Sequence, residues 1–149
     1  MSALRNIVVL DSNLVVSAFL NPRGAAAAAL CIAIENFEVV CSKETFAELA
    51  EVLQRDKFDR YASKQERLAR LQAYAQSVLF YNVPLNVTDC KDPKDNKFLA
   101  LAVTTHAKAL VSGDKKDFVS MNPYLGIPII GVREFIETYP QVQRAGLQE

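Results

Sequence analysis

The chain has 149 residues, half of them hydrophobic, with only five glycines and six prolines. This composition excludes a disordered protein and predicts one globular domain over residues 1–149, long enough to bury about two-thirds of its unfolded surface. Seventeen basic residues balance 17 acidic ones, so net charge provides no general attraction for nucleic acid or an anionic membrane.

The cysteines and the apolar runs indicate the cellular compartment of the protein. Cys31, Cys41 and Cys90 are odd in number and lack the spacing of a metal site, which favours free thiols in a reducing compartment. The run Ile7–Leu10 is too short for a signal peptide, and the nine apolar residues Ala25–Ala33 are too few to span a membrane. We therefore expect a cytoplasmic protein with no membrane contact.

The first half of the chain alternates strands with helices. Ile7–Leu10 is an unbroken run of β-branched residues and leucine, typical of a parallel strand buried on both faces. Asp11 follows it directly, and the apolar residues in 14–19 then have helical spacing. A helix over Ala25–Asn36 and a strand over Glu38–Cys41 are predicted next.

Two capped helices follow. Ser42 caps a helix that runs to about Gln54, whose outer side carries three glutamates, Glu44, Glu48 and Glu51. Such a charged stripe is most often a solvated face, and periodicity does not single out any of the three. A capping box at Ser63 opens a helix to about Leu79, where leucines on one side indicate packing or an oligomer surface.

The second half continues the alternation. Residues 85–88 form a predicted short extended piece, and strands are predicted over Ala109–Ser112 and Ile127–Ile130, with Pro128 favouring an edge position for the latter. A last helix spans Val132–Tyr139, and the tail 141–149 carries no pattern. The pattern predicts a three-layer α/β/α sandwich around a Rossmann-like, mostly parallel sheet of four to five strands, with its core over about 6–137.

The stretch Asp92–Ala102 begins another helix, with Asp92 as N-cap and Pro93 as its first residue. Asp95 shares one face with the apolar residues at i+3, i+4 and i+7, so the face that carries it should turn inward. A buried carboxylate needs a partner. One interpretation is a capping box at the helix N-terminus, and the other is a functional site.

Three aspartates point to the second interpretation. Asp11 and Asp114 follow buried strands and Asp95 faces inward, so all three can meet at the carboxyl edge of a parallel sheet. Converging carboxylates repel unless a cation lies among them, and an all-oxygen donor set suits Mg²⁺ or Mn²⁺. Such an ion supports phosphodiester hydrolysis. For Asp11 alone, capping of the following helix remains an alternative.

Four segments in order resemble a PIN domain: residues 8–13 (VVLDSN), 42–49 (SKETFAEL), 92–102 (DPKDNKFLALA) and 111–114 (VSGD). The likeness runs from about Asn6 to about Glu137 and is greatest to the subgroup described as toxins of toxin–antitoxin systems. It implies a Mg²⁺- or Mn²⁺-dependent ribonuclease that cleaves single-stranded RNA through an acidic site. The implied catalytic and metal-binding acids are Asp11, Glu48, Asp95 and Asp114.

The resemblance also assigns secondary roles. Asn13 and Ser112 match the polar residues that usually support the site, Asn96 is grouped with them, and Asp92 and Asp117 are extra acids that could bind a second ion through water. A basic rim for the RNA backbone is expected from Arg23, Lys43, Lys94, Lys97, Lys115 and Lys116, although any one of these could simply be solvated. An antitoxin partner rests on the resemblance alone, and a homodimer is expected.

Two other functions fit parts of the sequence. A haloacid-dehalogenase-like phosphatase also places an aspartate after its first strand, but it needs a second one two residues later, where this chain has Asn13. A catalytically silent PIN-like module that binds RNA or protein is the other alternative. The complete set of acids argues against it, because an unused charge cluster lowers stability.

Overall fold

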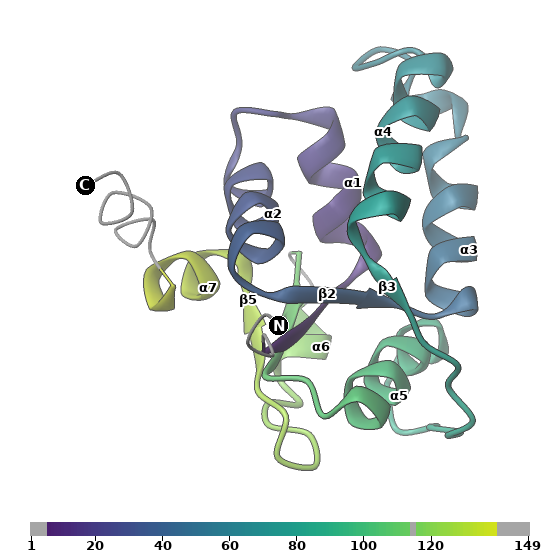
Figure 1. The fold of residues 1–149 in the computed structure, drawn as a ribbon. Helices are drawn as coiled ribbons and strands as arrows, with labels where there is room; N and C mark the ends of the chain where they lie inside the picture. The colour runs from purple at the N-terminus through teal and green to yellow at the C-terminus, as the bar shows by residue number, and fades with distance from the viewer. Residues whose placement is uncertain (1–5, 114–115, 140–149) are drawn as a thin grey trace, which may run out of the picture.

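A computed structural model of the chain describes residues 6–113 and 116–139; the side chains of Lys116 and Asp117 lie outside the described part. Asp114, Lys115 and the tail 141–149 therefore also lie outside it. The described strands form one five-stranded sheet in the order β3-β2-β1-β4-β5 (Figure 1). They are β1 (Ile7–Leu10), β2 (Glu38–Cys41), β3 (Leu79–Phe80), β4 (Ala109–Ser112) and β5 (Ile129–Gly131). Every neighbouring pair is parallel, which confirms the predicted sheet.

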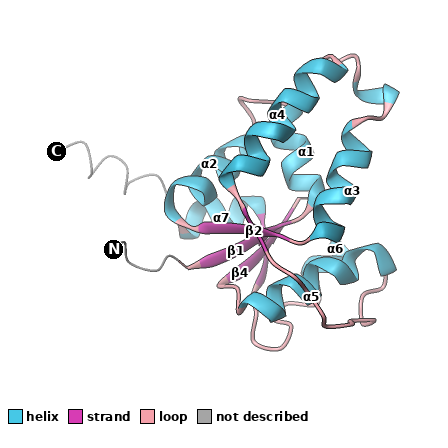
Figure 2. Ribbon diagram, turned by 45° about the vertical axis from the view of Figure 1, so that its right-hand side comes forward, coloured by secondary structure: helices cyan, strands magenta, loops and turns pink. Residues whose placement is uncertain are grey.

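Helices cover both faces of this sheet, so the predicted three-layer sandwich is also confirmed (Figures 1 and 2). One face is covered by α1 (Ser12–Leu20), α2 (Ala25–Asn36), α3 (Lys43–Leu53), α4 (Lys64–Ser77) and α7 (Val132–Thr138). The other face is covered by α5 (Asn96–Thr105) and α6 (Lys116–Val119). Because side chains alternate along a strand, Val8 joins the first core and Val9 the second.

The carboxyl ends of the central strands meet at one edge. In the register of β1 with β4, Leu10 lies opposite Val111, and the N–H of Asp11 donates to the carbonyl of Val111 over 3.1 Å. Asp11 and Ser112 therefore emerge side by side, at the edge where α1 begins. Ser42 directly follows β2 at the same edge and caps α3, as the sequence predicts.

Helix α4 differs from its prediction. It ends at Ser77, and Leu79 belongs to β3, because Val78 is extended and residues 79–80 pair with β2. Of the predicted leucine stripe, Leu71 is buried, whereas Leu68 and Leu79 are 43% and 46% exposed, so the stripe packs only in part. The packing face of α4 consists of Leu71 with Arg67 and Tyr74. The guanidinium of Arg67 is buried because it donates to main-chain carbonyls at the end of α3 and in the turn after it.

The last strand and the extended piece also differ. Residues 85–88 form no strand, and β5 begins at Ile129 rather than Ile127. Pro128 has no N–H to donate to a ladder, while Ile127 pairs back to Tyr124 in an isolated antiparallel bridge. The edge position predicted from Pro128 is correct, since β5 ends the strand order.

Within the residues that the structure describes, no single helix is long and apolar enough to cross a membrane. Only α1 and α2 taken together meet that test of length and composition, and they are bent by 111° relative to each other.

Candidate active site at the carboxyl edge of the sheet

Asp11 lies at the centre of this edge, 2% exposed, directly after β1. Its Oδ1 accepts the N–H groups of Leu14 and Gly113, both at 3.0 Å, and its Oδ2 accepts the hydroxyl of Ser112 at 2.5 Å. An ionised carboxylate has about four acceptor positions, and these bonds fill three. The remaining position on Oδ2 allows Asp11 to bind a cation through one oxygen. Asp11 also caps α1, so the capping role predicted as an alternative is correct. This role does not exclude a second one in the site.

The protonation of Asp11 reflects this buried position. Burial raises the pKa of Asp11 from 3.8 to about 6, because the charged form loses its hydration. The hydrogen bonds from Gly113, Ser112 and Leu14 lower the pKa, and the negative charge of Asp95 raises it further. A cation beside Asp11 would stabilise the charged form and so oppose this rise in the pKa.

Asp95 is the second buried carboxylate, at 7% exposure. It ends the 3₁₀ turn η2 (Pro93–Asp95), which Asp92 caps through a 3.0 Å bond from the N–H of Lys94. The predicted helix thus starts as a tighter turn, and α5 proper begins at Asn96. Asp95 stands at the N-cap of α5 but makes no side-chain capping bond there. The structure therefore does not show the side chain of Asp95 as a cap of α5.

Glu48 reaches the same edge from α3. Its Oε1 accepts the ammonium of Lys97 at 2.6 Å, and the two side chains are 23% and 25% exposed. Lys97 was predicted to face the RNA backbone, but here it links α5 to α3. The glutamate is thus not part of a fully solvated stripe, although periodicity favoured that interpretation.

The supporting residues divide into two groups. Ser112 is fully buried and holds Asp11, and Asn13 lies in the first turn of α1. Asn96 accepts the N–H of Cys90 at 2.8 Å and so fixes the loop before η2. Asp92 is exposed and acts as a cap. Asp114 and the side chain of Asp117 lie outside the described part of the chain.

The expected basic rim is only partly at this edge. Lys43 begins α3 and Lys94 lies in η2, both exposed and both near the carboxyl ends of the strands. Arg23 follows the far end of α1, about 14 Å of helix away from Asp11. Lys115 and the side chain of Lys116 lie outside the described residues.

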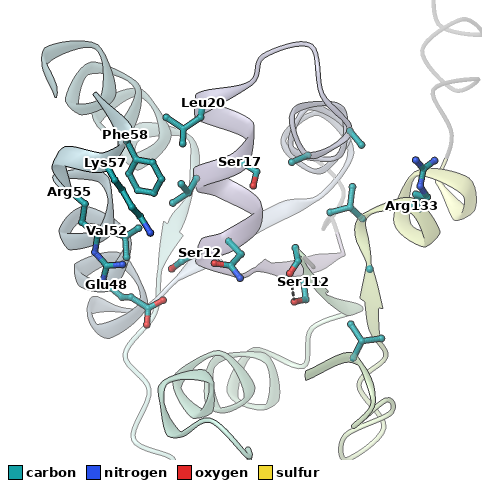
Figure 3. Close-up of a pocket in the computed structure, with 18 of the residues that line it drawn as sticks. Ser12, Ser17, Leu20, Glu48, Val52, Arg55, Lys57, Phe58, Ser112 and Arg133 are labelled. Atoms are coloured by element: carbon teal, nitrogen blue, oxygen red, sulfur yellow. Dashed lines mark hydrogen bonds between the residues drawn. The ribbon is translucent and has the colours of Figure 1, made fainter. Parts of the chain in front are cut away.

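A cavity of about 1010 Å³ opens at this edge, lined by Glu48, Ser112 and Gly113 but not by Asp11 or Asp95 (Figure 3). Glu48, Arg55 and Lys57 come from α3 and the turn after it on one side, Arg133 lies on the other, and Ser12 and Ser112 lie between (Figure 3). Three cations thus line a cavity that reaches the carboxyl edge. No local sequence pattern identifies Arg55, Lys57 or Arg133 as cavity residues, because their elements meet only in the folded chain.

Two further features of the site were not predicted. A Cβ at Gly113 would lie 2.8 Å from the amide nitrogen of Leu14, so this glycine is required for the close approach of β4 to α1. Its amide is one of the donors to Asp11. In the described residues the buried Oγ of Ser12 has no hydrogen-bond partner, which leaves a polar group for water or a ligand.

The described donors fit a hard, hydrated cation. No group of three Asp, Glu, His or Cys side chains within 6–113 and 116–139 is arranged to hold a metal. Mg²⁺, however, is commonly held by one or two carboxylates, with water and substrate phosphate completing its shell. Asp11 and Asp95 are both buried, and the negative charge of Asp95 makes the smallest of the contributions to the pKa of Asp11. The oxygen-only chemistry excludes a zinc site of the Cys/His type among these residues.

Comparisons with known proteins concern the family and the fold of this chain. The family model described as "PIN domain" matches residues 7–116. An uncharacterized protein of Methanocaldococcus jannaschii, MJ1680, is 30% identical over 149 residues, covering 93% of this chain and 95% of that protein.

Two solved structures share the fold. VapBC2 from Rickettsia felis, bound to a DNA fragment from their promoter, superposes with a TM-score of 0.61 at 15% identity, covering 84% of this chain and 98% of the other. DNA-bound VapBC from Salmonella typhimurium gives a TM-score of 0.59 at 13% identity, covering 87% and 99%.

Proposed function

This chain belongs to the PIN domain family, and on that premise we propose that it is a ribonuclease that hydrolyses phosphodiester bonds of single-stranded RNA with Mg²⁺ or Mn²⁺. PIN domains are generally nucleases and typically use divalent metal ions. The observation that carries the proposal is the pair of buried carboxylates, Asp11 and Asp95, at the carboxyl edge of the sheet. Burying two like charges together is unfavourable unless a cation joins them.

Each residue of the site has a defined task in this proposal. Asp11 and Asp95 bind the ion, with Ser112 and the amide of Gly113 fixing the orientation of Asp11. Asp114 completes the set from the end of β4. When bound, the ion supplies an activated water and neutralises charge on the phosphate. Glu48 joins the ion or its water from the opposite side of the edge.

The cavity beside the site supports a polyanionic substrate. Although the chain is neutral overall, Arg55, Lys57 and Arg133 place three cations around a hollow that also reaches Glu48 and Ser112. Cations next to an acidic centre attract the phosphates that flank the bond to be cleaved. This local arrangement replaces the general attraction that net charge does not provide.

We also propose partners for the protein. An antitoxin is proposed because the family resemblance and both VapBC neighbours point to a second protein. A homodimer remains a proposal, for which the exposed apolar side chains Leu68, Leu79 and Phe80 offer a surface. A reducing, cytoplasmic location is consistent with Cys31, Cys41 and Cys90, none of which forms a disulfide within the described residues.

A cleavage assay on a panel of single-stranded RNAs tests the proposal. The chain is stripped with EDTA and then supplied with Mn²⁺ or Mg²⁺, and small phosphate esters are assayed in parallel. We expect RNA fragments only with the metal present and no phosphate release from the esters. Ester hydrolysis would favour the phosphatase alternative, and metal-dependent activity on neither substrate would favour a silent binding module.

A further inference from the structure

Lys97 holds a position that the proposed metal chemistry does not account for. Its ammonium lies 2.6 Å from Glu48 and 2.5 Å from the carbonyl oxygen of Lys94, and it stands over the ring of Phe98 at 5.7 Å from the centroid. The lysine is two residues beyond Asp95, on the element that brings Asp95 to the site. A positive charge is thus fixed at the edge where the carboxylates gather.

This ion pair is not an ordinary surface pair. About three-quarters of each side chain is covered, and the partners come from α3 and α5, which lie on opposite faces of the sheet. Exposed pairs contribute little to stability because water and salt screen them, and that screening is reduced here. The pair therefore connects the two helical layers at the site itself.

The same geometry puts Lys97 in competition with a metal. Glu48 lines the large cavity, whereas Lys97 lines a second cavity of about 400 Å³ together with Asn96 and Glu44. The pair thus stands between the two hollows. A divalent cation entering beside Asp95 would repel the ammonium and attract the Oε1 that the ammonium now holds. The second cavity gives Lys97 space to withdraw, with the carboxylate of Glu44 in its lining.

We propose that Lys97 is the resident counter-ion of Glu48: it holds this carboxylate in the metal-free chain and yields it when the divalent ion binds. Lys97 is thus a positioning residue whose charge lowers the affinity for the ion while stabilising the empty site. The inference rests on the proposed function, because it requires a divalent ion at these carboxylates.

Mn²⁺ titration by calorimetry tests this role without any activity measurement. Removing the competing charge with Lys97→Met should tighten Mn²⁺ binding about three- to tenfold. Lys97→Arg keeps a cation and should bind Mn²⁺ within about twofold of wild type. Lys94→Met is the matched control, because it makes the same charge change three residues earlier, in η2. Its affinity for Mn²⁺ should stay near that of wild type.

Melting temperatures supply a second readout. In EDTA, Lys97→Met should melt roughly 2–4 °C below wild type, because Glu48 loses its counter-ion, and saturating Mn²⁺ should abolish that difference. In a Glu48→Gln background, Lys97→Met should no longer tighten Mn²⁺ binding.

Failure of this inference is distinct from failure of the proposed function. The inference is overturned if wild type binds Mn²⁺ and Lys97→Met binds it equally well or more weakly. It is also overturned if Lys97→Met melts lower than wild type by the same amount with and without Mn²⁺. Either result would mean that Lys97 only connects two helices. If wild type binds no Mn²⁺, the metal-dependent function fails and the competition fails with it.

Discussion

The backbone N–H of Gly113 donates to Oδ1 of Asp11 over 3.0 Å, joining two residues that are 102 positions apart in the chain. The bond places the end of β4 against the first turn of α1. It also orients the carboxylate on which the proposed chemistry depends. Several expectations follow from the tightness of this contact and from the burial around it.

Replacing Gly113 by alanine should damage both fold and site. The added Cβ would meet the amide nitrogen of Leu14 at 2.8 Å, and the nearest atoms are all backbone of Asn13 and Leu14, which leaves little room to relax. We expect a loss of about 1–3 kcal/mol in the free energy of unfolding, measured with urea, and weaker RNA cleavage. Gly131→Ala is the control for stability, because a Cβ there meets nothing within 4 Å and should cost less.

Asp11→Asn should abolish cleavage and change how stability depends on pH. The pKa of Asp11 is about 6 in the folded chain against an ordinary 3.8, so between these values the folded chain holds more protons than the unfolded one. The free energy of unfolding therefore falls as pH rises from about 4 to 6 and then levels off, by up to about 3 kcal/mol from this group. The variant lacks that contribution.

Urea unfolding in EDTA at several pH values measures this difference. Near pH 4 the variant should match wild type, and at pH 7 it should be more stable, by something on the order of 1 kcal/mol or more. An asparagine that is less stable than wild type at pH 7 would show that the ionised carboxylate stabilises the metal-free fold.

Substitutions of Asp95 and Asp92 should separate a loss of RNA cleavage from a loss of helix capping. Asp95→Asn should lose cleavage while its melting temperature in EDTA stays level or rises, because the side chain makes no capping bond to α5. Asp92→Ala should lose the cap on the N–H of Lys94, at a cost of about 1 kcal/mol, and keep part of its activity. A clear fall in the melting temperature of Asp95→Asn would instead indicate a structural role.

Asp114 and Asp117 test which acid completes the site after β4. In the sequence Asp114 comes two residues after the end of β4, whereas Asp117 lies three residues further on, within α6. We expect Asp114→Asn to be nearly inactive and Asp117→Asn to lose only about 10–100-fold, as for a residue that acts through water. Cleavage of one RNA at saturating Mn²⁺ measures both, and equal, near-complete losses would contradict the assignment.

The central strands were predictable because their signal is local. Runs such as Ile7–Leu10 and Ala109–Ser112 are buried on both faces, so their composition alone identifies them. The caps at Ser42 and Ser63 are equally local and match the structure. Strand β3 has only two residues, and it depends on pairing with β2, which sequence periodicity does not report.

The candidate site was predictable only as far as its parts carry a local pattern. Asp11 and Asp95 could be placed from a strand end and a helix face, and both are buried as expected. The pairing of Lys97 with Glu48 depends on the approach of two helices from opposite faces. Arg67 donates to the carbonyls of Leu53 and Ala62, which lie outside its own helix. The residue pattern of that helix therefore does not predict that Arg67 is buried.

The most direct test of a metal-dependent ribonuclease is cleavage of a single-stranded RNA by EDTA-stripped protein before and after Mn²⁺ is restored. Wild type, Asp11→Asn and Asp95→Asn are prepared identically and shown to be folded. The carboxylate site predicts fragments from wild type only after Mn²⁺ is added, and none from either variant. Equal cleavage by the variants, or cleavage by wild type that persists in EDTA, would contradict it.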